Sequence, residues 1–196
     1  MIILPIRLSI LRLPLSGYRY AMIDIEKLRY PIGKYVAPAA FTTDVIAGWI
    51  EDIATLPKHI KTEVEGLTAD ELQQTYRPGG WTIQQLVHHC ADSHMNAFIR
   101  FKLALTEDNP TIKPYMETIW AELPDTLELP INASLLILEG VHARMAILLK
   151  SLTPEQLQRT FVHPEHNRTQ SIAFTIGSYA WHGKHHLAHI MLAKNA

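Results

Sequence analysis

TIQQLVHHCADSHMNAFIRFKLAL, residues 82–105, carries an apolar side chain at almost every third or fourth position. This spacing is the period of an α-helix with one buried face. Thr82, followed three residues later by Gln85, matches a capping box, in which two side chains satisfy the first backbone N–H groups of a helix. We therefore predict an amphipathic helix from Thr82 to about Leu105. Its buried stripe comprises Ile83, Leu86, Val87, Cys90, Ala97, Phe98, Phe101 and Leu105.

Three other segments show the same period, so the pattern predicts four substantial helices. They span residues 43–66, 132–149 and 171–194. Pro57 lies inside the first of these segments, where a proline should kink the helix or split it in two. Capping boxes at Thr68 and Thr153 indicate two further short helical turns. The stretch that precedes the last helix is compatible with a small hairpin or an irregular connection.

The segment between the second and third long helices, residues 106–130, contains four prolines and little periodicity. A loop of this length in a compact domain is more often a functional cover than a simple connector. Four amphipathic helices with one long crossover loop describe an all-α four-helix bundle. In such a bundle, sites are built from the side chains of facing helices.

The composition limits the classes of partner. Of the residues, 47% are hydrophobic, and 18 Lys+Arg balance 19 Asp+Glu for a formal net charge of -1 at pH 7. Because nucleic-acid-binding domains carry a basic patch, we expect no nucleic-acid partner. The single cysteine, Cys90, cannot form an intrachain disulfide, which suits a cytoplasmic protein. We interpret Cys90 as a small core residue.

Residues 1–21 have the apolar bias of a targeting segment. Prolines and arginines interrupt every apolar run, so neither an uncharged signal-peptide core of about seven residues nor a membrane span of about twenty is present. Met22 is a second plausible translation start. We interpret residues 1–21 as an N-terminal extension and residues 22–196 as a single domain, and we expect no membrane association.

Histidines gather near the end of the chain, in WHGKHHLAHI, residues 181–190. At about 100° per residue, His186 lies at the edge of the apolar stripe with His182 and His189 beside it, whereas His185 turns away. His182 and His186 stand one turn apart, so their imidazoles can converge on one metal ion. A helix supplies two ligands in this way, and a third must come from another segment.

The helix of residues 82–105 offers His88, His89 and His94 as the third ligand. Periodicity places His94 in the middle of the apolar stripe, His89 at its flank and His88 more outward, so spacing alone favours His94. Three histidines with an open position for water would form a catalytic zinc-type site, and a single cysteine excludes a cysteine-rich structural site. The alternative is a plain interaction bundle whose histidines only form hydrogen bonds in the core.

Two stretches resemble a known family: residues 77–115, RPGGWTIQQLVHHCADSHMNAFIRFKLALTEDNPTIKPY, and residues 179–190, YAWHGKHHLAHI. They are similar to the YfiT-like branch of the DinB-like superfamily, metal-binding proteins folded as four-helix bundles. The likeness extends from about Tyr30 to the C-terminus. It implies that a divalent metal is held by His89, His182 and His186. His94 then becomes a candidate for supporting a ligand, for lining the pocket or for catalysis.

The resemblance implies a metal-dependent enzyme, described as a hydrolase. Related branches are similar to S-transferases of a low-molecular-weight thiol such as bacillithiol or mycothiol. In both cases the ion is a Lewis acid that lowers the pKa of a water or a thiol at the open position. We expect one zinc or nickel ion per chain, although imidazole also suits copper and iron. We further expect a small-molecule substrate and a homodimer. The competing class is a non-catalytic metal-binding or stress-response protein.

Other residues near the motifs are candidates for supporting roles. Asp92 is a second catalytic candidate in addition to His94. A carboxylate near the motifs can orient a ligand imidazole or act as a general base. The same applies to Glu107 and Asp108, although acidic residues are more often solvated. Arg100 and Lys102 could bind an anionic substrate, but lone cations on a helix usually face water. Four aromatic residues could line a pocket or pack in the core: Trp81, Tyr115, Trp120 and Trp181.

Overall fold

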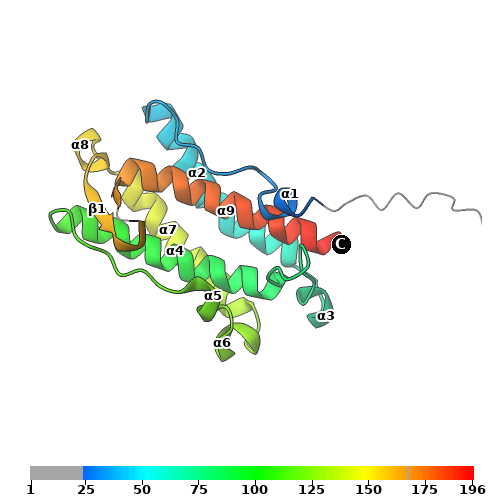
Figure 1. The fold of residues 1–196 in the computed structure, drawn as a ribbon. Coiled ribbons are helices and arrows are strands. Elements are labelled where there is room, and N and C mark those ends of the chain that lie inside the picture. Colours follow the sequence, from blue (N-terminus) through cyan, green and yellow to red (C-terminus); the bar gives the residue numbers. More distant parts are fainter. Residues whose placement is uncertain (1–23, 167) are drawn as a thin grey trace, which may run out of the picture.

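The computed structural model describes residues 24–166 and 168–196 and contains four long helices (Figure 1). These are α2 (Thr43–Val64), α4 (Ile83–Thr106), α7 (Asn132–Lys150) and α9 (Ile172–Lys194). Each agrees with its predicted range to within two residues at either end, so the predicted four-helix bundle is confirmed. The predicted extension, residues 1–21, and the start at Met22 lie outside the described residues.

Side-chain caps set the starts of α2, α4 and α9, at Thr42, Thr82 and Ser171, and the capping box predicted at Thr82 is confirmed. The Thr82 hydroxyl accepts a hydrogen bond from the backbone N–H of Gln85, and the Gln85 side chain accepts one from the N–H of Thr82. The same reciprocal bonds begin α3 (Ala69–Leu72) and α8 (Pro154–Leu157). These bonds satisfy N–H groups that the first helical turn leaves without partners.

α2 continues through Pro57 without a break, so of the two expected effects of this proline, a kink or a split, the split does not occur. Proline removes one backbone hydrogen bond and its ring opposes the carbonyl one turn back. The apolar face on both sides of it is nevertheless buried, with Ile53, Leu56 and Ile60 at most 3% exposed. Burial of this continuous face holds both halves of α2 in one helix.

The long helices form a ring in which α2 and α4 each pack against both α7 and α9. Side-chain contacts give their directions. α2 and α9 run parallel, because two ion pairs join them in the same order along both helices, Asp52 with Lys184 and Glu63 with Lys194. α4 runs antiparallel to α9, because His89 contacts His182 whereas Arg100, further along α4, contacts Tyr179, which is earlier on α9.

α4 and α7 are parallel neighbours, since His88 bonds Ser134 and His94 stacks on His142. To start a parallel neighbour, the chain must return along the whole of α4, which has 24 residues and is therefore about 36 Å long. Residues 107–131 make this return along the bundle, and they include α5 (Glu117–Trp120) and α6 (Pro124–Leu127) (Figure 1). The predicted crossover loop is confirmed.

The crossover is fastened to α4 and to a small hairpin. Amides of Gln84 and Gln85 on α4 donate to carbonyl oxygens of the crossover. The hairpin pairs β1 (Thr160–His163) antiparallel with β2 (Arg168–Ser171) around the 3-10 turn η1 (Pro164–His166). A parallel bridge joins Thr111 of the crossover to Val162. Of the two alternatives for this region, the hairpin is the one that forms.

The described core has two apolar clusters, separated along α4, α7 and α9 by a layer of buried histidines. On α4, for example, His94 lies between Ala91 of one cluster and Ala97 of the other. Among the described helices, α7 is long and apolar enough to cross a membrane, a test that core helices of soluble proteins also pass. The remaining helix, α1 (Ile25–Arg29), lies beside the C-terminal half of α9 (Figure 1).

Candidate metal centre

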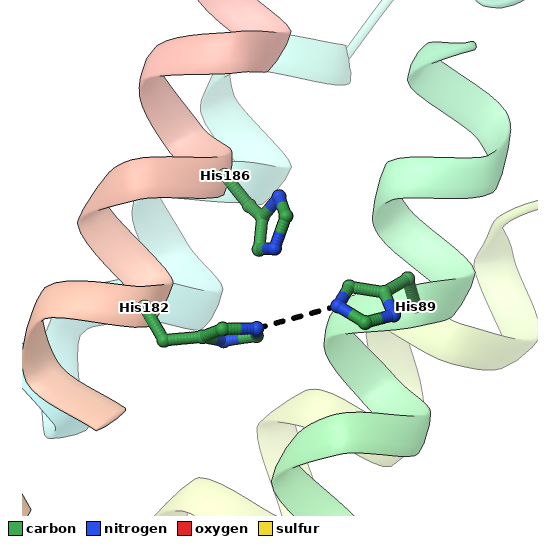
Figure 2. A group of neighbouring side chains, drawn as sticks. All are labelled: His89, His182 and His186. Carbon is green, nitrogen blue, oxygen red and sulfur yellow. Dashed lines mark hydrogen bonds between the residues drawn. The ribbon is translucent and has the colours of Figure 1, made fainter. Parts of the chain in front are cut away.

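Three histidines converge where α4 faces α9. His89 comes from the first half of α4, and His182 and His186 lie one turn apart on α9. Figure 2 shows their three rings pointing toward one another. The Nε2 atoms of His89 and His182 are 3.3 Å apart, and one ring nitrogen from each of the three lies within 4.8 Å of the others. We call these residues the histidine triad.

The triad is neutral in these surroundings. Burial lowers the pKa of His89 to about 4, with a further contribution from the nearby His185. Burial and the neighbouring histidines also lower the pKa values of His182 and His186 well below the usual range. Neutral imidazole has a lone pair that can bind a metal ion.

The spacing of His89 and His182 fits two ligands of one divalent cation. Zinc–nitrogen bonds of about 2.0–2.1 Å at tetrahedral angles place two ligand nitrogens about 3.4 Å apart, close to the 3.3 Å between His89 and His182. Imidazole nitrogens suit zinc, nickel, copper and iron. His89 and His182 therefore have the spacing of two ligands of such an ion, and His186 adds a third donor nitrogen within 4.8 Å of both.

Two further histidines, His189 and His94, contact ring nitrogens of the two triad residues on α9. Nε2 of His189 donates to the carbonyl oxygen of Arg29 at 3.2 Å, so Nδ1 of His189 is free to accept from Nδ1 of His186 at 3.4 Å. Nε2 of His94 lies 3.2 Å from Nδ1 of His182. Nδ1 of His186 therefore carries the proton of its bond to His189, and the Nε2 lone pair of His186 remains for a metal ion. The same holds for His182 in the tautomer in which its Nδ1 donates to His94.

His94 is fully buried, as its place in the apolar stripe predicted, but it lies behind His182 and outside the triad. Its ring stacks on His142 of α7, with ring centroids 4.7 Å apart. His142 was not among the predicted site residues. Its spacing from Leu138 and Met145, four residues before it and three after, is the signal that could have placed it in the same layer.

Two expectations about histidine direction are wrong. His185 does not turn away into solvent: it is 7% exposed and stacks on Trp181, with ring centroids 4.6 Å apart. His88 does not point outward: it is 5% exposed and bonds the Ser134 hydroxyl and the Leu129 carbonyl oxygen. Each helix packs against two long helices and a covering segment, so more than one stripe of it is buried.

A cavity of about 420 Å³ opens beside the triad, and all three histidines line it. Trp81, Tyr115 and Trp181 line it as predicted aromatic candidates, and the Trp81 ring centroid is 4.6 Å from that of His89. Trp120 lies outside the lining and packs on Tyr115. Lining residues not predicted from the sequence are Ser93, Pro114, Glu117, His163, Glu165 and Tyr179.

The charged candidates lie in different places. Asp92 is half-buried outside the cavity lining, and burial, with Asp125 adding, raises its pKa to about 6. Glu107 and Asp108 are exposed at the end of α4. Lys102 is exposed above the Phe98 ring. Arg100, in contrast, is only 9% exposed and lines the cavity, so the expectation that it faces water is wrong.

Comparison with known proteins identifies the family of this chain. Residues 44–190 match the profile of the DinB superfamily. The chain belongs to the DinB superfamily. A solved structure similar to it is "YfiT from Bacillus subtilis", described as "a probable metal-dependent hydrolase with an unusual four-helix bundle topology". The two share 42% identity at a TM-score of 0.83, over 86% of this chain and 97% of that one.

Curated relatives of this DinB-superfamily chain carry a similar name. Proteins of Bacillus mycoides and Bacillus cereus, each named "putative metal-dependent hydrolase", are 51% and 53% identical to it over 166 residues. These matches cover 85% of this chain and 95% of each relative. The resemblance to the YfiT-like branch of the DinB-like superfamily is confirmed.

Proposed function

We propose that the chain is a metal-dependent hydrolase that holds one divalent ion, zinc or nickel, through His89, His182 and His186. The observation that carries this proposal is the position of the triad, which lies at the wall of a cavity that gives access to it. A closed structural site would instead surround its ion with four protein ligands. The names of the relatives support hydrolysis, and a cavity of about 420 Å³ suits a small-molecule substrate.

A bound divalent ion would supply Lewis acidity, which polarises the bond to be broken and favours a deprotonated nucleophile. The residues of the chain do the remaining work. His94 and His189 hold protons at Nδ1 of the two ligands on α9 and so keep their Nε2 atoms directed at the ion. Trp81, Tyr115 and Trp181 line the cavity with aromatic rings against which substrate can pack.

A general base for hydrolysis is available in the cavity. Glu117 and Glu165 line it, and a carboxylate can accept a proton from an attacking water. We propose His94 as an orienting residue, because it is fully buried behind His182. Asp92 has a raised pKa of about 6 that suits proton exchange, but we assign it no step because it is absent from the cavity lining.

A low-molecular-weight-thiol S-transferase of the bacillithiol type is a second candidate. Cys90 is fully buried and burial raises its pKa to about 12, so the chain provides no thiolate of its own. A reacting thiol would therefore be a small molecule bound in the cavity beside the triad. A non-catalytic metal-binding protein would use the same three histidines without turnover.

The test begins with elemental analysis of purified, tag-free protein. We expect about one ion per chain in the wild type and none in the triple variant His89→Ala, His182→Ala, His186→Ala. His59→Ala removes an exposed histidine of α2 and should leave the metal content unchanged. Equal metal in the wild type and the triple variant would show that these residues are not the ligands.

The loaded protein is then assayed with a panel of esters and amides, and separately with bacillithiol and an alkyl halide. Metal-dependent hydrolysis without a thiol supports the hydrolase, and metal-dependent loss of thiol supports the transferase. Metal binding with neither reaction supports the non-catalytic protein. We also propose that residues 22–196 act as one cytoplasmic domain and that two chains form a homodimer.

A further inference from the structure

Arg100 lies on nearly the same face of α4 as His89. Eleven residues separate them, about three helical turns, so the two side chains leave the helix in nearly the same direction. Ser93 lies between them on this face. Arg100 is 9% exposed, and all three residues line the cavity beside the triad.

The guanidinium of Arg100 lacks a negative partner. Its Nη1 donates to the Tyr179 hydroxyl at 3.1 Å, and its Nε is buried without a hydrogen-bond partner. Among the described residues, the ion pairs do not include Arg100, although Glu117 and Glu165 line the same cavity. Guanidinium stays charged in proteins, and a buried, unpaired charge is costly. An anion that enters the cavity would offset this cost.

Tyr179 connects Arg100 to the triad. The ring centroid of Tyr179 lies 5.6 Å from that of His182, while its hydroxyl accepts the hydrogen bond from Arg100. The side chain of Tyr179 therefore bridges the Arg100 guanidinium and the proposed metal ligand His182. With Nη1 engaged by Tyr179, the edge formed by Nε and Nη2 remains for a ligand.

We propose that Arg100 binds the anionic group of the substrate, which is a small molecule with a carboxylate or a phosphate at one end and the reacting group at the triad. The Nε–Nη2 edge of a guanidinium matches the two oxygens of such a group. Between the two ends, the body of the molecule packs against the aromatic walls. This inference rests on the proposed function, since it names the substrate class of the same site.

The experiment compares metal-binding probes that differ only in the tail. Metal-loaded protein is titrated by calorimetry with acetohydroxamate, which has an uncharged tail, with succinate monohydroxamate, and with an analogue that ends in a phosphonate. We expect at least one charged tail to tighten binding to the wild type by about tenfold or more. The tail that gains more affinity distinguishes a carboxylate from a phosphate.

Variants assign this preference to Arg100. Arg100→Met should abolish the gain, Arg100→Lys should retain part of it, and Lys102→Met, which removes an exposed cation two residues away, should retain all of it. Because Arg100→Met removes a buried unpaired charge, its Tm should not fall. A purely structural role for Arg100 predicts a lower Tm with an unchanged tail preference.

Equal affinity for charged and uncharged tails in the wild type, or a preference that survives Arg100→Met, would overturn the proposal. Elemental analysis of the same samples separates this failure from that of the proposed function, since a wild type without metal contradicts only the latter. If the wild type holds no metal, the affinities of benzoate and benzamide for the metal-free protein are compared. Tighter binding of benzoate that is lost in Arg100→Met supports the anion site, and equal binding overturns it.

Discussion

His94 and His88 are buried on the same helix but have different partners. His94 contacts Nδ1 of His182, whereas His88 bonds Ser134 and the carbonyl oxygen of Leu129. Partners that orient a metal-ligating histidine typically contribute 10–100-fold to metal affinity. We therefore expect His94→Leu to weaken zinc binding by about this factor, measured by competition with a chromophoric chelator.

His88→Leu is the matched control for this measurement. It leaves the Ser134 hydroxyl and the Leu129 carbonyl oxygen without their partner, and an unsatisfied buried polar group costs about 1–3 kcal/mol. The Tm of this variant should fall while its zinc affinity stays unchanged. If both variants lost zinc affinity equally, affinity would follow the stability of the fold and not the contact with His182.

The sequence predicts some of these residues better than others. His182 and His186 lie on one helix, so their spacing alone brings the two rings together. The choice between His89 and His94 depends on where α9 lies relative to α4, which helix periodicity does not contain. The burial of Arg100 depends on Tyr179, 79 residues away, and on the crossover that lines the same cavity. Such contacts follow only from the tertiary structure.

At the scale of elements, the spacing between α9 and α2 depends on glycine. A Cβ at Gly183 would overlap the Leu56 side chain of α2, and a Cβ at Gly177 would overlap Tyr35 and Trp49. The absence of a side chain at these two positions allows the two parallel helices to approach closely. Gly183 directly follows His182, so the same contact sets how far α9 presents its two histidines toward α4.

Gly183→Ala should destabilise the protein even though alanine favours helix. Overpacking a core contact costs about 1–3 kcal/mol, and helix propensity returns about 1 kcal/mol. Gly140→Ala on α7 is the control, because nothing lies within 4 Å of a Cβ there, and it should stabilise by up to about 1 kcal/mol. Urea unfolding measures both changes. Stabilisation by both substitutions would show that the α2–α9 contact relaxes freely.

Local signals predicted the elements well, whereas their arrangement required the structure. The capping boxes at Thr82, Thr68 and Thr153 act within four residues, so the sequence contains all of their partners. The prolines of residues 106–130 indicated the crossover for the same reason. The parallel pairing of α4 with α7 has no local signal, because it depends on which faces of distant helices meet.

At the scale of the whole molecule, buried neutral histidines make the stability of the metal-free protein depend on pH. The pKa values of His89, His185 and His189 are lowered to about 4, mainly by burial, and those of His94, His142, His182 and His186 are lowered as well. In the unfolded chain a histidine has a pKa of about 6.5. Between these values the unfolded chain binds more protons, so stability falls as pH falls.

We therefore expect the Tm of metal-free protein to decrease steadily from about pH 7 to about pH 4.5, measured by calorimetry. Asp92, with its pKa raised to about 6, acts in the opposite sense over this range, but it is one group against several. The triple histidine variant should show a shallower slope because three of these groups are removed. Equal slopes would assign the acid sensitivity to groups outside the triad.

Cys90 is the one cysteine of the chain, follows the proposed ligand His89 directly and has no exposed surface. An alkylating reagent can reach its thiol only when the surrounding part of α4 opens. The alkylation rate in native buffer thus reports the frequency of these openings. An ion bound to the triad lowers the population of open states by mass action. Labelling kinetics at this single natural thiol therefore measures how often the metal centre comes apart, without any engineered probe.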